Sequence, residues 1–135
     1  MSRTDGMTMV EVLAAMAVVA LVGGGMMSAH LYGHRQSEQS RNHGIAARHA
    51  NSLMEDIQAT SFAGLASRFP GGVANGPAGF SYAQTIGGYT LDGEQIIVTY
   101  PAIVPGRQEL LVTVNWTEWG SPRTLRLSTV RTTDS

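Results

Sequence analysis

One apolar stretch limits how this chain can fold: the run from Met7 to Leu31, in which Glu11 is the only charged side chain. As an α-helix these residues would be about 37 Å long, at roughly 1.5 Å per residue. That length exceeds the hydrocarbon core of a bilayer, which is about 30 Å thick. No charge occurs between Val12 and Ala29. We therefore predict a membrane-spanning or membrane-anchored helix at the start of the chain.

Glu11 is the unusual residue of this run. A carboxylate near the middle of a bilayer costs about 3 kcal/mol on insertion scales, so such acids usually have a function. Nothing else in the apolar run can neutralise it. One interpretation is an acid near the start of a simple signal anchor, whose carboxylate reaches the interface. The other is a carboxylate that pairs with a group from outside its own segment.

Two cleavage sites are conceivable. The small residues at Gly23–Gly25 and Ser28–Ala29 could act as the cleavage site of an ordinary secretory signal. That interpretation leaves Glu11 inside the apolar core of the signal, where it would oppose insertion. The alternative is cleavage before the apolar run, after Gly6.

The residues from Arg3 to Gly6, followed by Met7–Leu13 with its acid at Glu11, resemble the class III signal of type IV pilins and pseudopilins. In that family a peptidase cuts after the last glycine of a short polar leader and N-methylates the new first residue. The resemblance implies that Gly6 ends the leader, Met7 is the mature N-terminus and Glu11 acts in assembly. Most members have Phe at the position of Met7.

The implied segments are a leader at 1–6, a transmembrane assembly helix at 7–32, an amphipathic continuation at 33–65 and a head at 66–135. Cleavage would free an amine at Met7, which in a filament could neutralise the Glu11 of a neighbouring subunit. An unpaired charge in a core of low dielectric constant is strongly destabilising, so this pair would favour one register of assembly. In an isolated, unprocessed chain we expect Glu11 to have no partner.

The flanking charges and the resemblance disagree about orientation. Arg35, Arg41 and Arg48 follow the apolar run, whereas the leader carries Arg3 and Asp5. The positive-inside rule therefore favours a cytoplasmic head. The resemblance implies a cytoplasmic N-terminus in a bacterial inner membrane, with the head later in a periplasmic or extracellular filament.

The rest of the chain predicts an α+β fold, in which the long N-terminal helix packs on a small antiparallel sheet of three or four strands. The helix should continue from Tyr32 to Thr60, because apolar residues recur at three- and four-residue spacing. A loop rich in Pro and Gly should follow from Arg68 to Gly88. The expected apolar stripe of the helix consists of Ala46, Ala50, Leu53, Met54 and Ile57.

Strands are expected at Tyr89–Leu91, Gln95–Tyr100, Glu109–Trp116 and Thr124–Arg131, with a turn at Gly120–Arg123. Alternation in the third strand predicts that Leu110, Val112, Val114 and Trp116 face the helix. The last hairpin resembles that of PilV-type minor pilins and I-type pseudopilins. Trp119, on the opposite face near the turn, could be a subunit contact, a ligand contact or a turn-packing residue.

Composition excludes several classes of function. The net charge is −1, so we expect no direct contact with nucleic acid. Without cysteine, the chain has no disulfide, thiolate metal site or cysteine nucleophile. His30 and His34 share a helical face but lie at the expected membrane exit, and Glu55 and Asp56 diverge around the helix. We therefore predict no enzyme, no catalytic residue, no metal and no cofactor.

The sequence thus favours a minor pilin that contributes to assembly, priming or modification of a type IV pilus. Its expected partners are other pilin or pseudopilin subunits, the prepilin peptidase and, before assembly, the inner membrane. One alternative is a minor pseudopilin of type II secretion. An alternative of another class is an uncleaved, signal-anchored binding module.

Overall fold

The computed structural model describes residues 8–82, 86–87 and 90–133. The chain divides into two compact units, Met1–Glu38 and Gln39–Ser135, which we call the helical unit and the head. Helix α1 (Met9–Ala59) contributes residues to both. It ends one residue before the predicted end at Thr60, and each unit is described by itself.

In the helical unit, α1 is long and apolar enough to cross a membrane. None of the side chains in its apolar stretch is buried, and large apolar groups such as Leu21 stand in the open. The helix therefore has a surface that its own unit does not cover. The predicted apolar helix, long enough to cross a membrane, is confirmed.

In the head, α1 buries one stripe of side chains. All five predicted residues of that stripe are buried: Ala46, Ala50, Leu53, Met54 and Ile57. Ile45 and His49 are buried beside them. The spacing of three and four residues places the stripe on one face of the helix, as an amphipathic helix requires.

The end of α1 is fixed by two side chains. The Thr60 hydroxyl donates to the Asp56 carbonyl at 2.7 Å, and Arg131 Nη2 donates to the Thr60 carbonyl at 3.1 Å. Both bonds satisfy carbonyls near the helix end that lack helical partners. A short 3-10 helix η1 (Phe62–Gly64) and helix α2 (Leu65–Arg68) follow.

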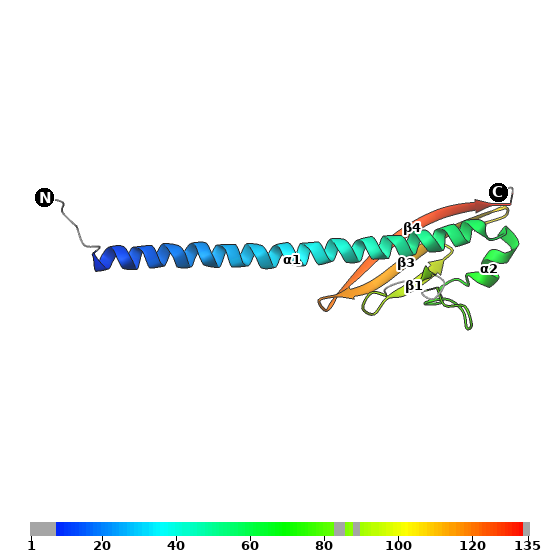
Figure 1. Ribbon diagram of the computed structural model, residues 1–135. Coiled ribbons are helices and arrows are strands. Elements are labelled where there is room, and N and C mark those ends of the chain that lie inside the picture. The colour runs from blue at the N-terminus through cyan, green and yellow to red at the C-terminus, as the bar shows by residue number, and fades with distance from the viewer. Residues whose placement is uncertain (1–7, 83–85, 88–89, 134–135) are drawn as a thin grey trace. The chain divides into compact units, whose positions relative to one another are not determined.

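The sheet of the head is antiparallel and centred on strand β3 (Arg107–Glu118). Strand β4 (Ser121–Thr132) pairs with one edge of β3. Strands β1 (Gln95–Thr99) and β2 (Ile103–Val104) pair with the other edge. Figure 1 shows the C-terminal part of α1 lying along this sheet. The predicted α+β fold is confirmed.

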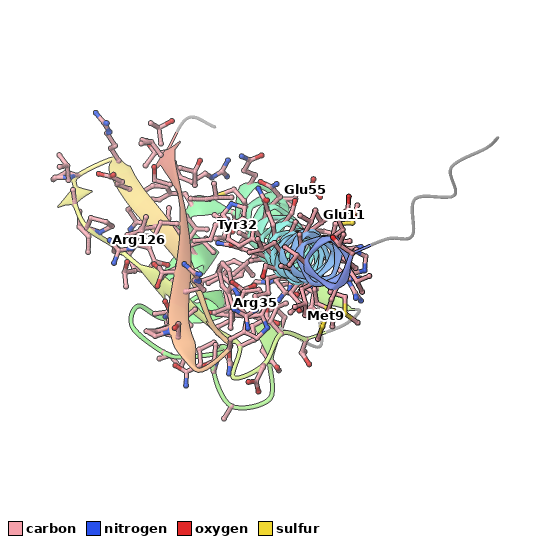
Figure 2. The ribbon with its side chains drawn as sticks, turned by 90° about the vertical axis from the view of Figure 1, so that its left-hand side faces the viewer. Met9, Glu11, Tyr32, Arg35, Glu55 and Arg126 are labelled. Atoms are coloured by element: carbon pink, nitrogen blue, oxygen red, sulfur yellow. The ribbon has the colours of Figure 1, made fainter. Side chains whose placement is uncertain are left out.

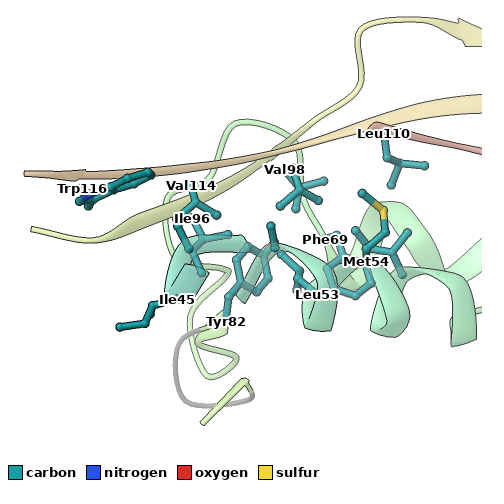
Figure 3. Close-up of a cluster of buried hydrophobic side chains, with 14 of the residues drawn as sticks. Ile45, Leu53, Met54, Phe69, Tyr82, Ile96, Val98, Leu110, Val114 and Trp116 are labelled. Carbon is teal, nitrogen blue, oxygen red and sulfur yellow. The ribbon is translucent and has the colours of Figure 1, made fainter. Parts of the chain in front are cut away.

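The core lies between the helix stripe and one face of the sheet (Figure 3). The four residues of β3 predicted to face the helix are all buried: Leu110, Val112, Val114 and Trp116. Ile96 and Val98 from β1 join them, and Phe69 and Tyr82 come from the segment between α2 and β1. At about 25 cal/mol per Å² of buried apolar surface, this cluster is the main stabilising contribution to the head.

The segment before β1 contains a required glycine. Asn75 Oδ1 accepts a hydrogen bond from the Ile96 N–H at 2.8 Å, and Tyr82 N–H donates to the Asn75 carbonyl. Between these contacts Gly76 has φ +91°, and a Cβ there would clash with the Phe80 carbonyl oxygen. The predicted loop is therefore held closely enough to place Tyr82 in the core.

Two predictions about the strands are wrong. Thr90 and Leu91 are not in a strand, and Tyr89 lies outside the described residues; Leu91 instead packs in the core ahead of β1. The turn is not Gly120–Arg123, because β4 already begins at Ser121. The actual turn is Trp119–Gly120, and β4 tolerates Pro122 because it is an edge strand.

Candidate assembly site at the start of the helix

Only one of the three predicted site residues lies within the described part of the chain. Glu11 is in the first turn of α1 and is exposed. Gly6 and Met7, the predicted processing residues, lie outside the described residues. Figure 2 shows Glu11 and Met9 projecting from the beginning of the helix.

Glu11 has a partner in its own chain, which corrects our expectation. The Thr8 N–H and the Thr8 hydroxyl both donate to Glu11 Oε2, at 2.9 and 3.1 Å. In return the Glu11 N–H donates to Thr8 Oγ1 at 3.4 Å. The Thr8 carbonyl accepts from the Val12 N–H at 3.2 Å, so Thr8 is the N-cap residue.

This arrangement is a capping box, in which an N-cap Thr and a Glu three residues later satisfy each other's backbone N–H groups. The pattern Thr8-Met9-Val10-Glu11 is its sequence signature, so the contact could have been predicted. Our prediction failed because it considered only the charge of Glu11 and not its hydrogen-bonding capacity. The carboxylate also lies at the positive end of the helix dipole, which favours a negative charge.

The capping box leaves room for a further partner. Both bonds from Thr8 reach Oε2, and the carboxylate remains exposed. A carboxylate has two oxygens and about four acceptor sites, so a cationic donor can bind without breaking the cap. The site can therefore hold a positive group brought to it from outside.

The surface beyond Glu11 is apolar and exposed. An open groove along the helix is lined by Val12, Ala15, Met16, Val19 and Ala20. These positions follow the i, i+3, i+4, i+7, i+8 spacing of a stripe on which another helix can pack. The two alanines allow a close approach of backbones, as in helix pairs within membranes.

His30 and His34 lie further along the same unit. Their rings are 4.7 Å apart between centroids and nearly perpendicular. Two imidazoles are too few for a closed metal site, which usually takes four ligands. Among the residues that the structure describes, no cluster of three or more His, Asp or Glu could hold a metal ion.

A second carboxylate, Glu94, was not singled out by the sequence. Its Oε2 accepts the Leu91 N–H at 2.8 Å, and its Oε1 lies 2.6 Å from His49 Nδ1. Both side chains are almost completely buried. His49 falls on the stripe of α1 between Ala46 and Leu53, and that position could have marked it as a buried histidine in need of a partner.

A third acid, Glu118, holds the end of β3. Its Oε1 accepts a hydrogen bond from Asn42 Nδ2 at 3.0 Å, and its Oε2 lies 3.2 Å from Arg123 Nε. The ring of His43 packs edge-on against Trp116 nearby, at 6.2 Å between centroids. These contacts join the β3–β4 turn to the part of α1 inside the head.

Two tyrosines, the buried Tyr82 and the partly buried Tyr100, complete the polar groups of the core. Burial, with a smaller contribution from Tyr100, raises the pKa of Tyr82 from 10.0 to about 12. Burial likewise raises the pKa of Tyr100, whose hydroxyl donates to the Phe69 carbonyl at 2.8 Å. Both hydroxyls are therefore neutral at physiological pH.

The geometry defines a class of protein: a small α+β head joined to an apolar helix long enough to cross a membrane, with an exposed acid in its first turn. Comparison with family models, with curated proteins and with solved structures finds no match to this chain.

Proposed function

We propose that this protein is a minor subunit of a type IV pilus, anchored in the bacterial inner membrane until it joins the fibre. In this proposal the chain is cleaved after Gly6 and N-methylated at Met7. The freed amine of one subunit pairs with Glu11 of its neighbour, and the head takes part in assembly, priming or modification. The same features would serve a minor pseudopilin of type II secretion, which the identity of the co-purifying subunits would distinguish.

The observation that carries the proposal is the exposed Glu11 at the start of an uncovered apolar helix. In the head, α1 buries its apolar stripe against the sheet, and the acids Glu94 and Glu118 have polar partners from distant parts of the chain. In the helical unit the apolar stretch is uncovered, and the exposed Glu11 is bonded to the neighbouring Thr8. An exposed apolar helix surface of this kind is typically covered by lipid and by other helices.

The capping box supports a particular order of events. Glu11 accepts bonds from Thr8, which would be the second residue of the processed chain. The isolated subunit therefore holds its carboxylate at the helix start with its polar groups satisfied. On assembly, the neighbour's amine would add a charge-assisted bond, which is about twice as strong as a neutral one. Such a site orients the acid before the partner arrives.

The test is incorporation into filaments in cells. Glu11→Gln keeps the capacity to accept the Thr8 bonds but removes the charge, and Glu11→Ala removes both. We expect both variants to be processed and to remain in the membrane, and both to be lost from sheared filaments. The matched control is Glu55→Gln, which changes an exposed acid of α1 inside the head. Normal incorporation of Glu11→Gln would contradict the pairing role.

A further inference from the structure

The turn between β3 and β4 contains a strained aromatic residue. Trp119 and Gly120 have φ values of +48° and +75°, so both central residues of this two-residue turn are left-handed. Such type I′ turns strongly prefer Asn-Gly or Asp-Gly, because residues with a bulky side chain are disfavoured at positive φ. Tryptophan is thus a poor choice for the turn itself.

Trp119 also adds little to the core. Its side chain is 53% exposed, whereas Trp116, three residues earlier, is 5% exposed. An exposed indole at a strained position gives the head no evident gain in stability. The hydrophobic interior therefore does not explain why a tryptophan stands here.

The turn is held in place by buried polar contacts. Glu118, directly before Trp119, is buried; it accepts a hydrogen bond from Asn42 of α1 and forms an ion pair with Arg123 of β4. These contacts fix the base of the turn while the indole extends from its tip. The exposed ring is thus presented from a rigid support.

The turn lies at the end of the head from which the apolar helix leaves. Asn42 and His43, the α1 residues beside the turn, are close in sequence to Gln39, where the head begins. Figure 1 shows this turn at the opposite end of the sheet from the C-terminus. Gln39 is seven positions after Tyr32, and seven steps of the chain reach at most about 25 Å at roughly 3.5 Å each. The length of the intervening chain therefore limits how far this end of the head can lie from the end of the apolar helix.

We propose that Trp119 is an interfacial anchor, whose indole inserts into the headgroup region of the leaflet next to the head. This inference rests on the membrane insertion in the proposed function. Tryptophan is enriched at membrane–water interfaces, because its ring is apolar and its N–H can still bond to water or headgroups. The anchor would hold the head against the membrane before the subunit enters a filament.

Lipid fits this site better than a second protein surface. The indole is flanked at the tip by Gly120, Ser121 and Pro122, which add little apolar area around it. A stable protein interface needs about 800 Å² from each partner, well beyond a single exposed ring. A lipid interface has no such requirement, and Arg123 at the base of the turn has a partly exposed side chain that suits anionic headgroups.

The test measures tryptophan fluorescence of the full chain in vesicles of phosphatidylethanolamine and phosphatidylglycerol. Trp116→Phe leaves Trp119 as the only tryptophan, and Trp119→Asn leaves Trp116. We expect lipids brominated near the headgroup to quench most of the Trp119 emission, and lipids brominated deep in the chain to quench less. The buried Trp116 should lose little emission with either lipid. If Trp116→Phe does not fold, subtracting the Trp119→Asn signal from that of the unaltered chain isolates Trp119.

The outcomes separate the two proposals. If the chain resists carbonate extraction but Trp119 keeps a water-exposed spectrum and is not quenched, the anchor is wrong and the assembly role is untouched. If quenching appears only in dilute samples and protection grows with protein-to-lipid ratio, the occupant is a second copy, which also contradicts the anchor. If the chain fails to insert, both the anchor and the membrane stage of the proposed function are wrong.

Discussion

Glu11 and Glu94 make the same local contact in opposite surroundings. Each carboxylate accepts the backbone N–H of the residue three positions before it, Thr8 in one case and Leu91 in the other. Glu94 is buried, and its second oxygen faces His49 from α1. Glu11 is exposed, and both bonds from Thr8 reach one oxygen. Both oxygens of Glu94 therefore have partners within the chain, whereas the carboxylate of Glu11 stays accessible to a further partner.

The two parts of α1 differ in the same way. Inside the head the helix buries a narrow stripe against the sheet, and its other faces are polar. From Met9 to Leu31 the helix is apolar except at Glu11, and its apolar stretch is uncovered. Both parts are helical, so burial within the chain, rather than helix formation, distinguishes the part of α1 that packs in the head from the part that the chain leaves uncovered.

The largest difference in stability between the two parts of α1 is expected from a pair of leucine truncations. Leu53 is fully buried, so Leu53→Ala should lower the free energy of unfolding by about 3 kcal/mol through lost burial and a cavity. Leu21 is 77% exposed, and Leu21→Ala should change the stability in detergent by less than about 0.5 kcal/mol. Denaturant unfolding followed by far-UV circular dichroism measures both. A large effect of Leu21→Ala would contradict the division of the helix.

The two acids give the next largest difference. Glu94→Ala removes the partner of His49 and of the Leu91 N–H, and stranded buried donors cost about 1–3 kcal/mol each. We therefore expect a loss of about 2–3 kcal/mol in the stability of the head. Glu11→Ala removes only an exposed cap, which is worth about 1 kcal/mol at most. Equal losses for the two variants in detergent would show that exposure does not distinguish the sites.

Alkaline pH should destabilise the head. The folded chain raises the pKa of Tyr82 from 10.0 to about 12, so it holds this proton more tightly than the unfolded chain does. The stabilisation is complete below pH 10 and is lost as the pH rises toward 12, with a loss of about 2 kcal/mol. Thermal unfolding between pH 9 and 12 measures it. Tyr82→Phe should flatten this dependence, and an unchanged slope in that variant would contradict the assignment.

The smallest effect concerns the β3–β4 turn and has the opposite sign. Trp119→Asn places a residue suited to positive φ in a type I′ turn, so it should stabilise the head by about 0.5–1 kcal/mol. Thermal unfolding of the full chain in detergent measures the change, with Ser121→Ala at the neighbouring exposed position as control. A destabilised Trp119→Asn variant would mean that the indole serves the fold after all.

Regular periodicity made most of the head predictable. The three- and four-residue spacing from Ala46 to Ile57 and the alternation from Leu110 to Trp116 each identified the buried face correctly. These patterns report burial directly, because one face of each element must leave water.

The polar contacts were harder to predict because they join residues distant in sequence. His49 meets Glu94 and Asn42 meets Glu118 only after the helix packs on the sheet. The turn was misplaced because a Trp-Gly pair is rare where Asn-Gly is usual. By contrast, the capping box of Thr8 and Glu11 is local and has a sequence signature that could have been used.

The mass of the N-terminus tests the central claim most directly. The proposal requires that the open acid site at Glu11 meets a processed amine, which exists only if the chain is cut after Gly6. Intact-mass and N-terminal peptide measurements on protein extracted from native membranes should show a chain that begins at N-methylated Met7. A chain that begins at Met1, or close to His30 after ordinary signal cleavage, would contradict the account.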